Sequence, residues 1–287
     1  MITVLVLGSN GQLGQCFQRL SLKEENIDWL FVDSSEVNIT SGFDVQQCFN
    51  SKQIDYCINC AAYTNVEKAE SEPKKAFLIN AGAVKNLAEI CRKSNSVLFH
   101  FSTDYVFKGG AEMPYVENDP TGPLNVYGKS KLKGEEVIIE NANRYFIFRT
   151  SWLYSQYGHN FFKTILAKAG KNEDLNITTA QRGAPTNANH LAKLVLKLIK
   201  NQNADYGIYH FSNTGETTWY GFAKEILRIS GNSEKVNLTP DNSYKTIAER
   251  PGYSVLNTSK GINTFDFHIP SWEEALEELY LDMGQDK

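Results

Sequence analysis

The sequence predicts an α/β protein with a doubly wound parallel sheet and a smaller α/β lobe. The chain opens with a strand, a turn containing three glycines and a helix, within residues 2–20. Strand-like runs recur at 29–33, 55–60, 97–102 and 145–149, with helical patterns between them. Strands that alternate with helices favour a parallel sheet covered on both faces.

The N-terminal segment indicates a dinucleotide site and hence a Rossmann-type sheet. Residues 2–7 form an apolar run rich in β-branched residues, which is typical of a buried strand. Gly8, Gly11 and Gly14 follow with the spacing G-x-x-G-x-x-G, and helical spacing continues through 15–20. Glycine allows backbone to approach a phosphate, and a helix N-terminus offers free N–H groups. The alternative is a tight turn before a surface helix; the position directly after the first strand favours the cofactor interpretation.

The composition describes an ordinary globular protein. Of the 287 residues, 41% are hydrophobic and 22% are charged, and the formal net charge is −4. With no basic cluster, nucleic acid is not an expected partner. There is no basic n-region with a cleavage site, and no apolar run approaches the ~20 residues that span a bilayer, so we expect a cytoplasmic protein without membrane contact.

The cysteines and histidines are expected to be structural. Cys57 and Cys60 form a C-x-x-C pattern, which can indicate a redox or zinc site. They lie in an apolar run, 55–62, with no second ligand pair, so buried reduced thiols are favoured. The histidines have no metal-ligand spacing and no Ser–Asp partners, so we expect core or surface positions for His100, His159, His190, His210 and His268.

The second strand ends in an acid that could bind the adenosine ribose. Asp33 lies 19 residues after Gly14, about where a carboxylate accepts hydrogen bonds from ribose hydroxyls. Ser34 and Ser35 supply no cation for a 2′-phosphate, which favours NAD. The alternative is an acid that merely ends a strand.

Helical signals continue through both halves of the chain. A helix is predicted over 73–94, with Ser71 as its cap and Pro73 in its first turn. Beyond Thr150 the pattern loosens, and a capping box at 271–274 starts the last helix. We expect a dinucleotide-binding domain at 1–152 and a smaller lobe, mainly 153–287, with some later elements returning to the first domain. Further helices are predicted at 161–169, 189–200, 219–229 and 271–281, with a short strand at 207–211.

A tyrosine and a lysine supply the strongest chemical signal. Tyr127 and Lys131 lie four residues apart at the start of a predicted helix and so share one face. A neighbouring ammonium is expected to lower the pKa of a phenol from about 10 toward a useful range. Thr103, in the loop after the fourth strand, offers a hydroxyl to the same substrate carbonyl. Alone, Y-x-x-x-K is weak; behind a glycine turn and an S-T loop it becomes strong.

Further segments extend this pattern into a family resemblance. The chain resembles the extended short-chain dehydrogenase/reductases over nearly its whole length and, among them, the dTDP-4-dehydrorhamnose reductases. This resemblance implies NADPH or NADH as cofactor and a dTDP-linked 4-keto-6-deoxyhexose as substrate. It implies reduction of dTDP-4-dehydro-L-rhamnose to dTDP-L-rhamnose for surface polysaccharide synthesis. The segments that carry it, besides the glycine turn, are 59–64, 67–73, 102–107, 123–131, 149–152 and 183–186.

The resemblance also implies roles for individual residues. Tyr127 would protonate the C4 oxygen as hydride arrives, with Thr103 and Lys131 completing the catalytic set. Arg250 would contact the diphosphate, since a guanidinium fork suits that group. The implied cofactor-binding residues are Gly8, Gly11, Gln12, Leu13, Gly14, Asp33, Ala61, Ala62, Tyr63, Asn80, Tyr127 and Lys131. The implied substrate-binding residues are Asp104, Tyr105, Trp152 and Arg250.

Departures from the family pattern leave some properties open. Some members bind a divalent metal at a dimer interface through acids where this chain has Cys16 and Asn189, so we expect no metal and a monomer or weak homodimer. Asn38 stands near a common aspartate, which leaves NAD or NADP undecided.

Two other functions stay open. One is a reductase of another nucleotide-linked 4-keto sugar. The other is a non-catalytic regulatory subunit of the methionine adenosyltransferase type, against which the intact set of Thr103, Tyr127 and Lys131 speaks. Epimerases and dehydratases share that set, but the pair Asp104–Tyr105 only half fits a dehydratase.

Overall fold

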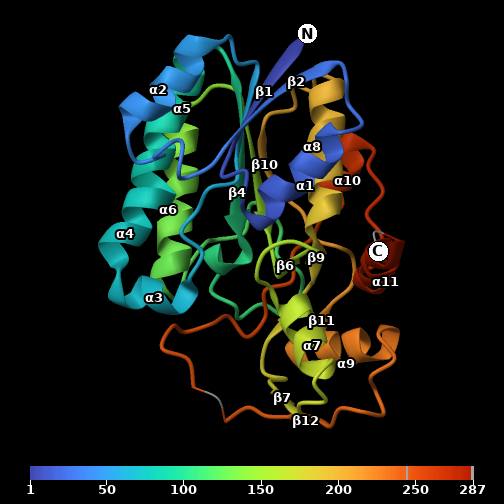
Figure 1. Ribbon diagram of the computed structural model, residues 1–287. Coiled ribbons are helices and arrows are strands. Elements are labelled where there is room, and N and C mark those ends of the chain that lie inside the picture. The colour runs from blue at the N-terminus through green and yellow to red at the C-terminus, as the bar shows by residue number, and fades with distance from the viewer. Residues whose placement is uncertain (244, 286–287) are drawn as a thin grey trace.

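A six-stranded parallel sheet forms the centre of the molecule, in the order β10-β5-β4-β3-β1-β2 (Figure 1). This computed structural model describes residues 1–243 and 245–285. The sheet confirms the predicted fold class and the predicted strands. The strands are β1 (Ile2–Leu7), β2 (Ile27–Val32), β3 (Tyr56–Asn59), β4 (Val97–Thr103), β5 (Tyr145–Thr150) and β10 (Gly207–His210).

Helices cover both faces of this sheet (Figure 1). On one face lie α1 (Gln12–Ser21), α8 (Ala188–Lys200) and α10 (Ser259–Phe265). On the other lie α2 (Gly42–Ser51), α5 (Ala83–Lys93) and α6 (Val126–Asn141). Alternate side chains of β1 pack into the apolar clusters on the two faces of the sheet. Val4 and Val6 belong to one cluster, and Leu5 and Leu7 to the other. This alternation explains the continuous apolar run at the N-terminus.

The predicted helix at 73–94 is interrupted, which corrects the sequence interpretation. It begins as α4 (Pro73–Phe77), widens into a π-helical turn (Leu78–Gly82) and continues as α5. The expected Ser71 cap is wrong, because Ser71 ends the preceding helix α3 (Val66–Ser71) and donates to the Lys68 carbonyl at 3.0 Å. The widened turn lies against Gly134 of α6, where a Cβ would come within 2.3 Å of the Asn80 carbonyl oxygen.

The second half of the chain builds a separate apolar cluster. Three helices contribute to it: α7 (Phe161–Ala169), α9 (Trp219–Ile229) and α11 (Trp272–Gln285). The predicted capping box at the start of α11 is confirmed, since Ser271 N donates to Glu274 at 2.8 Å and Glu274 N donates to Ser271 Oγ at 3.2 Å. Meanwhile β10 and α8 lie with the large sheet, in chain order after α7. A domain boundary at residue 152 stays a prediction.

Short strand pairs and a 3₁₀ turn complete the fold. β7 (Leu175–Ile177) pairs with β12 (Leu238–Pro240), β8 (Arg182–Gly183) with β11 (Thr217–Thr218), and β6 (Leu153–Tyr154) with β9 (Thr186–Asn187). The turn η2 (Asp104–Val106) directly follows β4. Within the described residues, every helix is too short or too polar to cross a membrane.

Candidate active site

The glycine turn between β1 and α1 has a backbone that other residues could not adopt. Gly8 has φ +75°, and a Cβ on it would lie 2.7 Å from the Ala61 nitrogen. A Cβ on Gly14 would lie 2.5 Å from the Gly8 carbonyl oxygen. Among the described residues no side chain caps the helix at Gly11, so N–H groups at the start of α1 are left for a ligand. This turn therefore fits the pyrophosphate of a dinucleotide.

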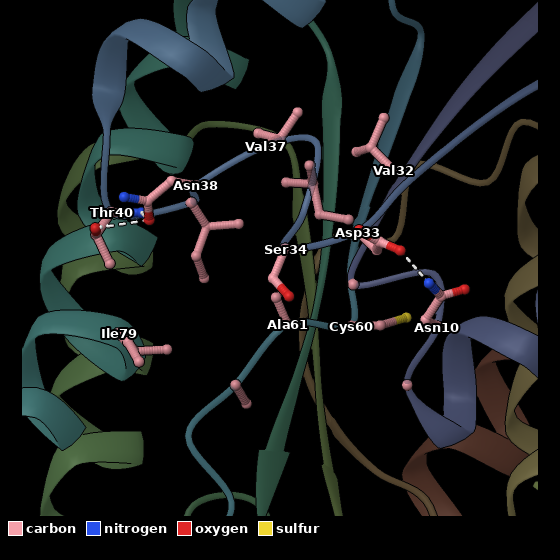
Figure 2. A pocket seen from close by; sticks show the side chains of 15 residues that line it. Asn10, Val32, Asp33, Ser34, Val37, Asn38, Thr40, Cys60, Ala61 and Ile79 are labelled. Atoms are coloured by element: carbon pink, nitrogen blue, oxygen red, sulfur yellow. Dashed lines mark hydrogen bonds between the residues drawn. The ribbon is translucent and has the colours of Figure 1, made fainter. Parts of the chain in front are cut away.

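A cavity of about 320 Å³ opens beside this turn, at the carboxyl ends of β1, β2 and β3. Figure 2 shows Asp33 directed toward Asn10, and Asn38 beside Thr40. The side chain and backbone N–H of Ser35 donate to Asp33 at 2.6 and 2.7 Å, and these bonds lower the pKa of the carboxyl. The cavity lining includes five residues expected to bind cofactor: Gly8, Gly11, Asp33, Ala61 and Ala62.

A second cavity, of about 650 Å³, continues from the glycine turn toward the smaller lobe. It gathers residues from β4, η2, α6 and three later segments of the chain. Gly128 allows α6 to pack closely here, because a Cβ on it would lie 2.4 Å from the Tyr105 carbonyl oxygen. Its lining includes eleven of the residues expected to bind or react: Gly11, Gln12, Leu13, Ala62, Thr103, Asp104, Tyr105, Tyr127, Lys131, Trp152 and Arg250.

The pKa of Tyr127 is affected more strongly by burial than by neighbouring charges. Its ring packs edge-on against Tyr105, with centroids 5.9 Å apart. Burial raises the pKa of Tyr127 to about 12, although a hydrogen bond with the Thr103 side chain acts in the opposite direction. The expectation that Lys131 lowers this pKa is wrong for this structure, because desolvation of the phenolate is the larger effect.

Lys131 is directed toward β4. Its Nζ donates to the Phe101 carbonyl at 2.6 Å and lies 3.3 Å from Nε2 of His100. Burial lowers the pKa of Lys131 to about 8, and Glu135 partly opposes this shift. The lysine is therefore held by groups beneath the cavity.

Asp104 is a buried carboxyl in the cavity wall, with only 2% of its surface exposed. Its Oδ2 accepts from Ser254 Oγ at 2.6 Å, and its Oδ1 accepts from Thr103 Oγ1 at 3.0 Å. Burial raises the pKa of Asp104 to about 6, against the effect of these hydrogen bonds. A carboxyl balanced in this way can donate or accept a hydrogen bond near neutral pH.

Arg250 is held in the cavity wall by an acid from the other half of the chain. Its Nη2 donates to Glu67 at 2.9 Å, and Glu67 also accepts from the backbone nitrogens of Ile247 and Ala248 at 2.8 and 3.3 Å. The Nε of Arg250 is buried without a hydrogen-bond partner among the residues the structure describes. A buried guanidinium N–H of this kind suits an anionic ligand group.

Trp152 has a left-handed backbone conformation, which is uncommon for a residue other than glycine. Its φ is +44°, and its indole stacks on Trp219 with centroids 3.7 Å apart and planes at 10°. Gly183 lies beneath the stack, where a Cβ would come within 2.6 Å of Trp152 Cε2. Both indoles line the larger cavity, so this stack forms one of its walls.

Residues 2–284 match the family described as RmlD substrate binding domain. The chain belongs to this family. It is 37% identical over 293 residues to the dTDP-4-dehydrorhamnose reductase of Salmonella typhimurium, with 98% of each chain covered. The structure of the Bacillus anthracis dTDP-4-dehydrorhamnose reductase in complex with NADP is also 37% identical, with a TM-score of 0.92 over 98% of this chain and 100% of that one. A Streptomyces antibioticus relative, named as a probable dTDP-4,6-dihydroxy-2-methyloxan-3-one 4-ketoreductase, is 33% identical, with 97% and 95% covered.

In this RmlD-family chain, three residues expected at the cofactor lie outside both cavity linings in the described part of the structure: Gly14, Tyr63 and Asn80. Gly14 instead permits the contact between α1 and the glycine turn. The hydroxyl of Tyr63 donates to Glu72 at 2.9 Å. Asn80 pairs with both backbone groups of Tyr63, at 2.8 and 3.0 Å. Tyr63 and Asn80 therefore shape the chain beside the cavity without facing it.

The C-x-x-C pattern does not bring its two sulfurs together for a shared site. Cys57 packs into the cluster on one face of the sheet and Cys60 against the cluster on the other. The described residues contain no group of three or more potential metal ligands among His, Cys, Asp and Glu. At the two positions where the resemblance implies acids in some members, Cys16 is buried and Asn189 hydrogen-bonds Gln156 at 2.9 Å.

Sequence reasoning missed four cavity residues or direct partners. Glu67, Ser254 and Trp219 are far in sequence from the side chains they contact, so spacing within a motif, even in segment 67–73, does not show these contacts. His100, expected to be a structural histidine, lies directly against Lys131. The spacing of Tyr127 and Lys131 does not identify the groups of the sheet that contact the lysine.

Proposed function

We propose that this chain is an NAD(P)H-dependent reductase that converts dTDP-4-dehydro-L-rhamnose into dTDP-L-rhamnose for surface polysaccharide synthesis. The observation that carries the proposal is the convergence of Thr103, Tyr127 and Lys131 in one cavity that continues from the glycine turn. Membership of the RmlD family supports the same activity.

The residues around the glycine turn would hold the cofactor. Backbone at Gly8 and Gly11 and the start of α1 would bind the pyrophosphate, and Asp33 would bind the adenosine ribose. Ala61, in the smaller cavity, and Ala62, which lines both cavities, would border the cofactor. When bound, NADPH or NADH supplies the hydride for the ketone.

Tyr127 would act as the general acid that protonates the C4 oxygen. A general acid must carry its proton at the start of the reaction, and the raised pKa of Tyr127 keeps the phenol protonated at neutral pH. The Thr103 hydroxyl, at the end of β4, would orient the same oxygen. Lys131 would hold the nicotinamide ribose and, while it is protonated, stabilise the developing phenolate.

The dTDP-sugar would occupy the part of the larger cavity nearest the smaller lobe. Asp104 and Tyr105 would contact the deoxyhexose, and Trp152 would close over it. Arg250 would bind the diphosphate, supported by its unpartnered buried Nε. Arg250 would thus bind the diphosphate of the dTDP-linked 4-keto-6-deoxyhexose, and the general acid Tyr127 would lie at its keto group.

An absorbance assay at the nicotinamide band tests this function. Purified protein is mixed with NADH or NADPH and then with enzymatically prepared dTDP-4-dehydro-L-rhamnose. We expect cofactor oxidation that requires the sugar, with dTDP-L-rhamnose as the product. Tight cofactor binding without oxidation would contradict this substrate assignment.

A second candidate is reduction of another nucleotide-linked 4-keto sugar. The Streptomyces antibioticus relative supports it, because its printed name is that of a different 4-ketoreductase at 33% identity. The same assay with a panel of dTDP-4-keto sugars separates the two, since the preferred substrate gives the higher kcat/KM.

We further propose a cytoplasmic monomer or weak homodimer that binds neither nucleic acid nor membranes. The net charge of −4 and the five free cysteines support this proposal. Sedimentation at several protein concentrations tests the oligomeric state, and a stable tetramer would contradict it. Cell fractionation tests the location.

A further inference from the structure

His100 and Asn59 lie on adjacent strands beneath Lys131. They are register partners in the parallel pairing of β3 with β4, and their surfaces are 1% and 3% exposed. Nδ2 of Asn59 lies 3.2 Å from Nδ1 of His100, and Nζ of Lys131 lies 3.3 Å from Nε2 of the same ring. The imidazole therefore bridges an amide and the lysine.

The amide of Asn59 fixes which ring nitrogen of His100 carries the proton. The backbone nitrogen of Ala61 donates to Oδ1 of Asn59 at 3.2 Å, which turns the NH₂ group toward the ring. Nδ1 can meet that NH₂ group favourably only as an unprotonated acceptor. The ring is neutral, because burial holds the pKa of His100 well below its ordinary value. The single ring proton is thus on Nε2, facing the lysine.

The Nε2–H group cannot hydrogen-bond to a charged lysine, but it can donate to a neutral one. An ammonium has three donors and no acceptor, so it would meet Nε2–H donor to donor. An amine has a lone pair that accepts Nε2–H, while its own N–H still donates to the Phe101 carbonyl at 2.6 Å. All of these contacts of Lys131 and His100 are satisfied together when Lys131 is unprotonated.

Within the described residues, no ion pair joins Lys131 to a carboxylate. Glu135, four residues further along α6, pairs with Arg149 of β5 at 2.7 Å and accepts from Ser102. The side chains of this ion pair are 1% and 4% exposed, so the two charges largely neutralise each other. The other titratable groups lining this cavity are Cys60, Asp104, Tyr105, Tyr127, His159 and Arg250.

We propose that His100, oriented by Asn59, is a positioning residue that favours the unprotonated form of Lys131 through an Nε2–H···Nζ hydrogen bond. The inference deepens the proposed function, on which it rests, because it concerns the lysine beside the general acid. When Lys131 releases its proton to solvent, His100 holds the amine that is left. The lysine can therefore take up and release a proton near neutral pH instead of remaining a permanent cation.

NMR titration of the full-length protein, labelled with ¹³C at the lysine Cε, tests this inference. The Lys131 resonance is assigned by its loss in Lys131→Met. His100→Leu removes the Nε2–H donor and keeps the burial, so the pKa of Lys131 is expected to rise by about 0.5 to 1 unit, the contribution of one hydrogen bond. In the second variant, Asn59→Asp, the carboxylate would accept Nδ1–H and move the ring proton away from the lysine, with a rise at least as large.

Matched controls separate this effect from general disturbance of the core. His210→Leu replaces a histidine that is equally buried, at 1% exposure, on β10, two strands from β4, and should leave Lys131 unchanged. His100→Gln can still offer an N–H to Lys131 and should retain the wild-type titration. An unchanged Lys131 titration in whichever of His100→Leu and Asn59→Asp folds would overturn the inference. The titration needs no sugar nucleotide, so a failed reductase assay would count against the proposed function alone.

Discussion

Glu67 and Arg250, 183 positions apart in the chain, form an ion pair of 2.9 Å that joins α3 to the polar segment preceding α10. The same carboxylate accepts from two successive backbone N–H groups of that segment, at Ile247 and Ala248. These bonds hold the pKa of Glu67 below its ordinary value, against the effect of burial. Glu67 therefore orders the segment that presents Arg250 to the larger cavity.

Glu67→Gln is expected to weaken binding of the dTDP-sugar without changing the chemical step. The amide can still accept one backbone hydrogen bond but loses the ionic bond to Arg250. Because the pair is partly exposed, at 33% and 26%, we expect a loss of about 1 kcal/mol, or a KM about fivefold higher. Initial-rate kinetics should show kcat within about twofold of wild type, since the proton donor is untouched.

Glu225→Gln is the matched control for this change. Glu225 forms an ion pair of 2.7 Å with Arg228 on α9, and neither residue lines the larger cavity in the described structure. Its KM should equal that of wild type. A fall in kcat with an unchanged KM in Glu67→Gln would show that Glu67 does not act through substrate binding.

Tyr127→Phe should abolish turnover while leaving cofactor binding intact. The substitution removes the phenolic proton and keeps the ring that packs against Tyr105. Loss of a general acid lowers kcat by about 10² to 10⁴-fold. Stopped-flow absorbance measures the rate, and quenching of tryptophan fluorescence by NADPH measures binding. Near-normal turnover would remove Tyr127 from the role proposed for it.

The sheet could be predicted because its signals are local. Residues 2–7 combine β-branched composition with apolar side chains on both faces, as a strand between two helical layers requires. The interruption of the helix at 78–82 could not be predicted in this way. Its apolar spacing continues through the π turn, and the close approach of the Asn80 carbonyl to Gly134 involves another helix, which this spacing does not encode.

The candidate site was predictable for residues that local sequence patterns place at the end of a strand or the start of a helix. Thr103 ends strand β4 and Tyr127 lies in the first turn of helix α6, so the topology brings them to the same sheet edge. Pairs such as Asp104 with Ser254 depend on where the second lobe folds back, which spacing does not encode. The pKa of Tyr127 was predicted in the wrong direction, because its sign depends on a balance between burial and neighbouring charge.

Asp33 should make the enzyme prefer NADH to NADPH. Its lowered pKa keeps it ionised at neutral pH, and in the described lining of the smaller cavity no lysine or arginine offsets its charge. A 2′-phosphate there would meet a carboxylate, so we expect Asp33→Ala to reduce the ratio of the NADPH Kd to the NADH Kd by about tenfold. Fluorescence titration without sugar measures both constants.

A second aspartate provides a close control for that experiment. Asp241 accepts from the side chain and backbone of Ser243 at 2.6 and 2.8 Å, the same arrangement that Ser35 makes with Asp33. Asp241→Ala removes this local motif outside the smaller cavity and should leave the ratio unchanged. A wild-type protein that binds NADPH as tightly as NADH would contradict the assignment of Asp33.

Asp104 should make the folded protein less stable as the pH rises. Its pKa is about 6 in the fold against an ordinary 3.8, so the folded state holds this proton more tightly than the unfolded state. The free energy of unfolding therefore falls between about pH 4 and pH 6, and the whole loss, up to about 3 kcal/mol, is present above that range. Asp104→Asn should remove the loss, although it keeps one acceptor in place of two.

Urea unfolding at pH 4 and pH 8 measures this effect. At pH 8 we expect the free energy of unfolding of Asp104→Asn to exceed that of wild type by at least about 1 kcal/mol. At pH 4, where the wild-type carboxyl is protonated, the two values should be nearly equal. Reductase activity should fall in the same variant, because the amide offers one acceptor oxygen in place of two and carries no negative charge. Asp174→Asn, at an exposed position, is the control for the loss of a carboxylate. Equal destabilisation of Asp104→Asn at both pH values would mean that its hydrogen bonds to Ser254 and Thr103 outweigh the burial of its charge.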